Sequence, residues 1–194
     1  MSEISGITQS ASELHRPEME ALVQLFYGGT RELGQFTAIA EQALPPTYGT
    51  LLSHHGHMTV TLEAFHESLV DVEAISERAE PTSYARQSQL TRHSDGAIVQ
   101  YGIMRIDLTG LPEQVRCEIE SLSAPLGRIL IRNNLLREVE LLALWRIELD
   151  ETLAQLLGLK AGDEVYGRSA AIHLEGQPAV DLLEIVKDRP TPVT

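Results

Sequence analysis

Apolar and polar residues alternate with a period of two over much of the middle and the end of the chain. The alternating runs cover residues 70–75, two stretches within 83–108, the long segment 137–149, and two stretches within 166–186. The two stretches within 83–108 are separated by HSDG, and the two within 166–186 by EGQP; both are turn sequences typical of hairpins. The pattern therefore predicts about six strands, several of which pair as antiparallel neighbours.

Other segments show the three- and four-residue apolar spacing of helices. One follows Pro17 and is stopped by glycines, and a second is expected from about Met58 to His66, after a break at Gly56. Further helices are expected within 112–122 and 151–159. Because the strands are joined by hairpins or short helices, an α+β fold is favoured: a single antiparallel sheet with helices packed on one side.

Composition limits the class of protein. The 194 residues, of which 22% are charged, predict one globular domain over 1–194. The net charge of −13 disfavours nucleic acid as a partner. No apolar run reaches the roughly 18 residues of a membrane span, and the N-terminus lacks the pattern of a signal peptide. We therefore expect a cytoplasmic protein that binds a small molecule; the sequence does not indicate its oligomeric state.

Two charged residues lie in runs that otherwise look like core. In 179–186 (AVDLLEIV), Asp181 and Glu184 face opposite sides of the strand, and Glu184 shares its face with Leu182. An ionised carboxylate there needs a partner, which is either a structural arginine or part of an active site. Arg86 poses the same question within 83–90 (SYARQSQL), and its anionic partner is either Glu184 or a ligand carboxylate.

Other candidate residues are less informative. The cluster His54, His55 and His57 lacks the spacing of a helical metal site, so solvated turn and helix-start positions are expected instead. Gly102 interrupts a strand, which indicates either a bulge or a ligand close to the backbone. The single cysteine, Cys117, is expected to be a small buried residue.

Four segments, taken in order, resemble the chorismate pyruvate-lyase family and the broader group of chorismate lyase-like proteins. They are LLSHHGHMTVTLEAF, SYARQSQL with the following hairpin and Gly102, APLGRIL, and YGRSAAIHLEGQPAVDLLEIV. The resemblance is strongest over residues 45–187. It implies a chorismate lyase-like fold and the cofactor-free conversion of chorismate to 4-hydroxybenzoate and pyruvate.

The resemblance also implies roles for particular residues. Arg86 corresponds to the arginine that grips the ring carboxylate, and Glu184 to the acid that contacts the ring hydroxyl; these are the expected catalytic residues. Met58, Gly102 and Leu126 correspond to residues that touch or adjoin the ligand. Bacterial ubiquinone-pathway members carry an arginine directly after the glycine, where this chain has Ile103. The expected substitute, Arg105, follows two residues later.

Two alternatives to this lyase remain open. The same fold serves as the effector domain of GntR-type regulators, so a non-enzymatic sensor of a carboxylated ligand, of the UTRA-like type, is the main alternative. Such regulators carry a winged-helix domain ahead of the sensor, and the first 40 residues here are expected to be too short and too acidic to form one. The other alternative is a lyase-like enzyme acting on a related cyclic substrate.

Overall fold

The computed structural model describes residues 16–135 and 137–188, and its centre is one antiparallel sheet of seven strands. The strands are β1 (Gly34–Ile39), β2 (Val70–Ala79), β3 (Ser83–Arg92), β4 (Ile98–Asp107), β5 (Arg137–Leu149), β6 (Glu164–Leu174) and β7 (Gln177–Val186). Their spatial order is β1-β5-β6-β7-β4-β3-β2. The α+β class is confirmed, and the expected count of six strands is corrected to seven. The additional strand, β1, has only Phe36 buried, which leaves its sequence without a clear alternation.

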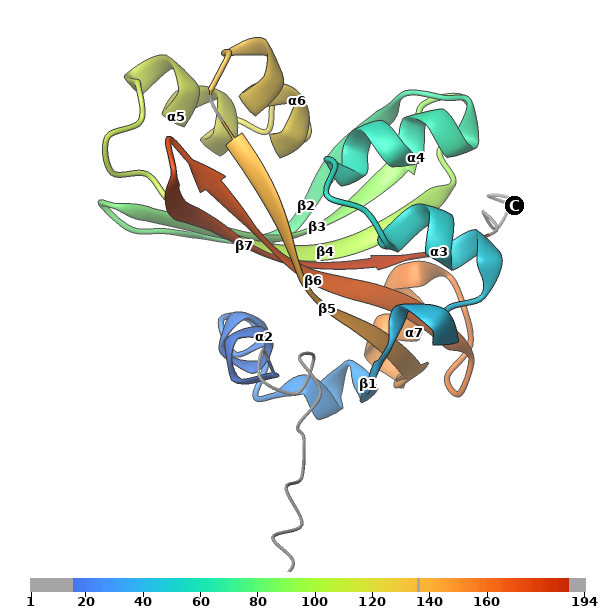
Figure 1. Ribbon diagram of the computed structural model, residues 1–194. Coiled ribbons are helices and arrows are strands. Elements are labelled where there is room, and N and C mark those ends of the chain that lie inside the picture. The colour runs from blue at the N-terminus through green and yellow to red at the C-terminus, as the bar shows by residue number, and fades with distance from the viewer. Residues whose placement is uncertain (1–15, 136, 189–194) are drawn as a thin grey trace, which may run out of the picture.

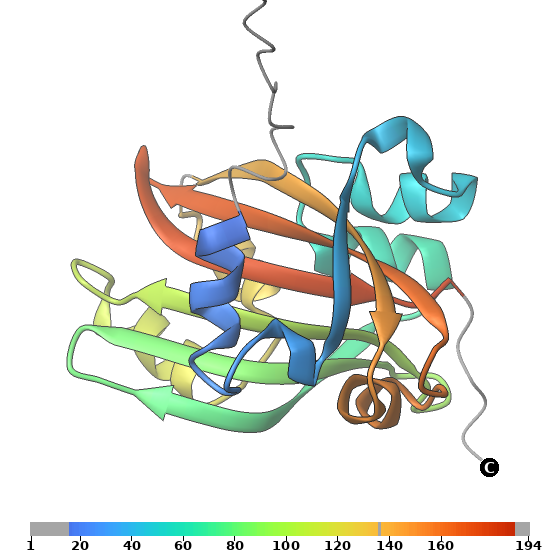
Figure 2. The ribbon, with the colours of Figure 1, turned by 90° about the horizontal axis from the view of Figure 1, so that it is seen from below.

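Helices cover both faces of this sheet. The helices α3 (Pro46–Leu52), α4 (Met58–His66), α5 (Glu113–Glu120) and α6 (Leu126–Arg132) lie together on one side, above the sheet in Figure 1. The helices α2 (Arg16–Val23) and α7 (Glu151–Leu157) lie below it, as Figure 2 shows from the other direction. Short 3-10 turns, Thr30–Glu32 and Glu41–Ala43, flank β1. Among the described residues, no helix is long and apolar enough to span a membrane.

The hairpins predicted by the two turn sequences are present. Strand β3 pairs with β4 across the HSDG turn, and β6 pairs with β7 across Glu175 and Gly176, both of which have positive φ. The pairing is regular at Gly102, so a bulge there is not the reason for the glycine. The bulges lie elsewhere, and one of them is in the β6–β7 pair, where Ala179 of β7 is left over between the partners of Ile172 and His173.

Each face of the sheet has its own core. On the lower face, residues such as Tyr101, Trp145 and Leu183 pack with α2 and α7. On the upper face, two clusters pack under the pairs α5–α6 and α3–α4. Both faces of the central strands are therefore buried, which explains why β7 is buried continuously from Leu183 to its end. The expectation of a buried Cys117 is wrong, because that thiol lies on the exposed side of α5.

Candidate functional site

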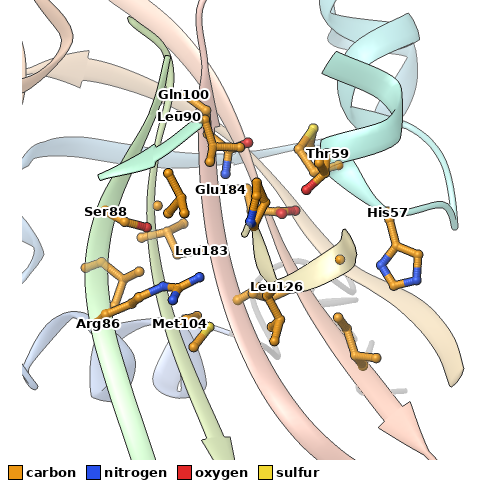
Figure 3. Close-up of a pocket in the computed structure, with 18 of the residues that line it drawn as sticks. His57, Thr59, Arg86, Ser88, Leu90, Gln100, Met104, Leu126, Leu183 and Glu184 are labelled. Atoms are coloured by element: carbon orange, nitrogen blue, oxygen red, sulfur yellow. The ribbon is translucent and has the colours of Figure 1, made fainter. Parts of the chain in front are cut away.

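A cavity lies between the upper face of the sheet and the helices α4 and α6 (Figure 3). The centre of a water-sized sphere can move through about 70 Å³ of it. Since one water needs about 10–15 Å³ on this measure, the cavity accommodates several waters or one small ligand. Polar side chains enter from the sheet and from the start of α4, and they stand among apolar ones. The polar lining residues are His57, Thr59, Arg86, Ser88, Gln100, Arg168 and Glu184.

Arg86 projects into this cavity from β3 and is only 3% exposed. Its Nη1 donates to the carbonyl of Ile119 at 3.3 Å, and its Nε has no hydrogen-bond partner among the described residues. The nearby acidic groups are the hydroxyl of Tyr84 and, behind it, Glu77, which accepts a hydrogen bond from that hydroxyl at 2.5 Å. Burial lowers the pKa of the guanidinium, although an arginine stays charged. Arg86 is thus a buried cation that lacks a direct carboxylate partner within the described chain.

Glu184 enters from β7 and is paired by a residue that the sequence did not single out. Arg168 of β6 stands directly opposite it in the ladder, and Arg168 Nε lies 2.7 Å from Glu184 Oε2. The two side chains are 1% and 9% exposed, so both charges are withdrawn from water and need each other. The open question about this carboxylate is therefore answered by a structural arginine, and that arginine is Arg168 rather than Arg86.

The other nitrogens of Arg168 hold the loop that leads into α4. Nη1 donates to the carbonyl of His54 at 2.9 Å, and Nη2 donates to that of Gly56 at 3.2 Å. The His54 ring is bonded on both sides, through Nε2 to the carbonyl of Leu51 and through Nδ1 to the amide of Gly56. Burial, reinforced by Arg168, lowers the pKa of His54, which favours the neutral ring. His54 is therefore held in the loop rather than solvated as expected, whereas His55 is exposed.

His57 is the last residue of this loop and the N-cap of α4. Its Nε2 accepts a hydrogen bond from Arg137 Nε at 2.5 Å, which leaves the ring proton on Nδ1. Burial, followed by the charge of Arg137, lowers the pKa of His57. Because α4 begins here, the N–H groups of Met58 and Thr59 have no intrahelical acceptor, and both residues line the cavity. Fixed donors and the positive end of the helix therefore face this space.

The segment APLGR has a packing role at the opposite wall. A Cβ on Gly127 would lie 3.3 Å from the Cβ and Nδ1 of His57 and from Thr59 Oγ1, so the glycine allows α6 to approach the start of α4 closely. Arg128 forms an ion pair with Glu63 of α4. These two residues tie α4 and α6 into one cover over the cavity.

Five of the six predicted site residues line this one cavity: Met58, Arg86, Gly102, Leu126 and Glu184. Arg105 does not. It lies on the face of β4 opposite Gly102, its side chain is 47% exposed, and its Nη2 contacts Asp181 Oδ2 at 2.6 Å. Arg105 shares its strand face with Ile103, but its exposed side chain is paired with Asp181 and does not line the cavity, so it does not supply the expected ligand contact. Asp181 faces outward, on the side of the strand opposite Glu184.

Four polar residues of the cavity, Thr59, Ser88, Gln100 and Arg168, were missed. Arg168 occurs in the recognised segment YGRSAAIHL, and Gln100 and Ser88 occupy the same strand faces as Gly102 and Arg86. Alternation alone could have placed Gln100 and Ser88 on the cavity face. Within residues 16–135 and 137–188, no group of three or more His, Cys, Asp or Glu side chains is arranged to hold a metal ion.

No family model and no curated protein matches this sequence. Solved structures do match its fold. The effector domain of PhnF from Mycobacterium smegmatis superposes with a TM-score of 0.50 and 13% identity, covering 68% of this chain and 88% of that one. The chain has the fold of this effector domain.

Two further structures have lower scores. The ligand-binding domain of a putative GntR-family transcriptional regulator from Bordetella bronchiseptica gives a TM-score of 0.45 at 13% identity, covering 64% of this chain and 90% of that one. The possible transcriptional regulator YydK from Bacillus subtilis gives 0.45 at 18%, covering 64% and 62% respectively. This chain thus spans under two thirds of the length of YydK.

These findings correct the expectation of an enzyme. The structure that matches the fold with a TM-score of 0.50 is an effector domain. The site is consistent with this correction because Glu184, the expected catalytic acid, is already bound to Arg168 and forms part of the wall. The chorismate lyase-like fold stands, and the expectation of lyase activity is not supported.

Proposed function

We propose that this chain is a non-enzymatic sensor domain that binds a small ligand with one carboxylate in the cavity beneath α4 and α6. The observation that carries the proposal is Arg86, which is buried without a carboxylate partner in the described chain and faces the cavity. Burying an unpaired cation is unfavourable, and a planar guanidinium matches a carboxylate in bidentate geometry.

The charges around the cavity support a ligand with a single negative charge. Arg168 and Glu184 neutralise each other, and the pKa of His57 is lowered, which favours a neutral ring. Arg86 is then the one cation among the described lining residues that lacks a counter-charge. The dianionic chorismate expected from the resemblance carries a second carboxylate, for which Arg105 on the opposite face offers no contact.

The construction of the cover supports a sensing role. The cavity lies between the sheet and the elements that Arg168, Gly127 and the pair of Arg128 with Glu63 hold together. A ligand in this space contacts the start of α4 and the start of α6 at the same time, because residues of both line it. Ligand binding therefore stabilises the closed cover, and the position of this cover is the property that a regulatory partner can read.

Isothermal titration calorimetry with uncharged-ring monocarboxylates, such as benzoate, 4-hydroxybenzoate and cyclohexanecarboxylate, tests this proposal. We expect saturable binding of at least one, and a rise in Tm of about 5–11 °C at a ligand concentration of 100 Kd. Arg86→Met should weaken binding by at least about 30-fold, since removing one partner of a buried charge pair costs 2 kcal/mol or more.

Arg105→Met is the matched control. It also removes one arginine charge, but Arg105 is an exposed residue of β4, the strand next to that of Arg86, and lies outside the cavity. The Kd should therefore stay unchanged. The ligand-free Arg86→Met protein should keep or raise its Tm, because the variant removes a buried cation that lacks a carboxylate partner. If Arg86→Met binds as tightly as the wild type, or if no monocarboxylate binds the wild type, the proposal is wrong.

A further inference from the structure

A second hollow lies against the cavity, on the other side of His57. Exposed residues, among them His55, Asn134 and Glu138, form its rim, so it is open to solvent. It holds about 610 Å³ on the measure used for the cavity. Two residues, His57 and Val139, line both the cavity and the hollow. The two spaces therefore adjoin at these two side chains.

Of these two side chains, His57 is the one that can move without disturbing the sheet. Val139 belongs to β5, pairs with Ile172 of β6 and is packed in the core under α5 and α6. His57 precedes α4, and its ring is half-buried at the edge of the cavity, below the start of α4 in Figure 3. The ring makes no capping hydrogen bond to α4, so its rotation leaves the start of the helix intact. His57 is therefore the side chain that can open and close a passage between the two spaces.

A hydrogen bond from Arg137 holds the His57 ring in place. The ring Nε2 accepts from Arg137 Nε of β5 at 2.5 Å. On its other side, a Cβ on Gly127 of α6 would lie 3.3 Å from Nδ1, so the ring spans the distance from α6 to β5. Arg137 is itself held, because its Nη1 donates to the carbonyl of Leu135 at 3.0 Å. Breaking the bond to Arg137 allows the ring to swing into the hollow, which has room for an imidazole.

We propose that His57 is a gate between solvent and the cavity, that Arg137 keeps it closed, and that ligands enter and leave through the outer hollow. This inference goes beyond the proposed function, because it holds for any molecule that reaches the cavity. A hydrogen bond from a charged donor shifts an equilibrium between closed and open states by about 10- to 100-fold. The bond therefore favours the closed state, and openings of the ring limit the rates at which a ligand binds and leaves.

The test measures how fast a thiol inside the cavity reacts with methyl methanethiosulfonate, a small uncharged reagent. Ile172→Cys places this thiol, because residue 172 is 2% exposed, lines the cavity and lies opposite Val139. Cys117→Ser in the same protein removes the one native thiol, which is exposed. Mass spectrometry follows the labelling. We expect the introduced thiol to react at least about 100-fold more slowly than Cys117 of the wild type, because the reagent reaches it only when the gate opens.

Two substitutions should open the gate in this double variant. His57→Ala removes the ring, and Arg137→Met removes the donor that holds it. Each should raise the labelling rate at least about 10-fold. His57→Gln is the conservative variant, because its amide has a similar reach and its Oε1 can accept from Arg137. Its labelling rate should stay within about 3-fold of the parent.

Gln87→Leu is the control for a general loosening of the fold. Gln87 is buried on the other face of the sheet, where its Oε1 accepts from the hydroxyls of Tyr27 and Tyr101 at 2.5 and 3.0 Å. Gln87→Leu in the same double variant should therefore lower the Tm, because it leaves two buried hydroxyls without their acceptor. Since the gate is untouched, the labelling rate should stay within about 3-fold of the parent.

Three outcomes would overturn the gate. In the first, Arg137→Met labels at the parental rate; this variant decides the matter even if His57→Ala does not fold. In the second, Gln87→Leu raises the rate as much as Arg137→Met, because lost stability then explains the access. In the third, the parental thiol reacts as fast as Cys117, because the cavity then has another entrance. The test uses no ligand of the cavity, so a failure of benzoates to bind refutes the proposed function and leaves the gate standing.

Discussion

Arg168→Met tests whether the buried ion pair between Arg168 and Glu184 supports the wall of the cavity. The substitution leaves the carboxylate of Glu184, whose side chain is 9% exposed, without its counter-charge. It also removes the donors to the carbonyls of His54 and Gly56. Breaking a buried pair from one side costs about 3–5 kcal/mol. For a chain of this size, each kcal/mol lowers Tm by about 2–4 °C, so we expect a fall of about 6–20 °C.

Urea denaturation followed by circular dichroism measures the change in the free energy of unfolding, and the slope m should stay at the wild-type value. The double variant Arg168→Met with Glu184→Leu is the control. Because replacing both members of a buried pair by apolar residues is often close to neutral, it should recover most of the loss. If Arg168→Met costs less than about 1 kcal/mol, or if the double variant is as unstable as the sum of the single ones, the pair does not support the wall.

Two further predictions concern pH and the outer surface. Because the pKa of His57 is lowered below its ordinary 6.5, by burial and then by Arg137, the unfolded chain binds the proton more readily than the folded one. The stability that the neutral ring contributes is therefore present above pH 6.5 and is lost as the pH falls below it. In wild-type protein the Tm should drop between pH 7.5 and 5.5, and His57→Gln should reduce this drop. An equal drop in both proteins would contradict the prediction. Asp181→Ala removes an exposed pair with Arg105, so it should change the free energy of unfolding by less than about 1 kcal/mol and leave ligand Kd unchanged; a larger effect in either measurement would contradict the outward placement.

The sequence by itself determined the fold class and most of the cavity face. Alternation with a period of two is a local property, and it correctly separated Glu184 from Asp181. The two turn sequences paired the correct strands, which brought Arg86, Gly102 and Glu184 to one face. The sequence did not predict strand β1, because β1 is an edge strand with one buried residue and its apolar residues do not alternate clearly with polar ones.

Which residue pairs with Glu184 was decided only by the tertiary structure. Counting back from the turn, where Leu174 pairs with Gln177, would place Gly167 opposite Glu184. The bulge at Ala179 of β7 shifts the register by one residue and brings Arg168 there instead. A shift of one residue reverses the face on which a side chain lies, and no local sequence pattern predicts this bulge. That register turns Glu184 from an expected catalytic acid into half of a buried ion pair, and it leaves Arg86 as the cation without a carboxylate partner in the cavity.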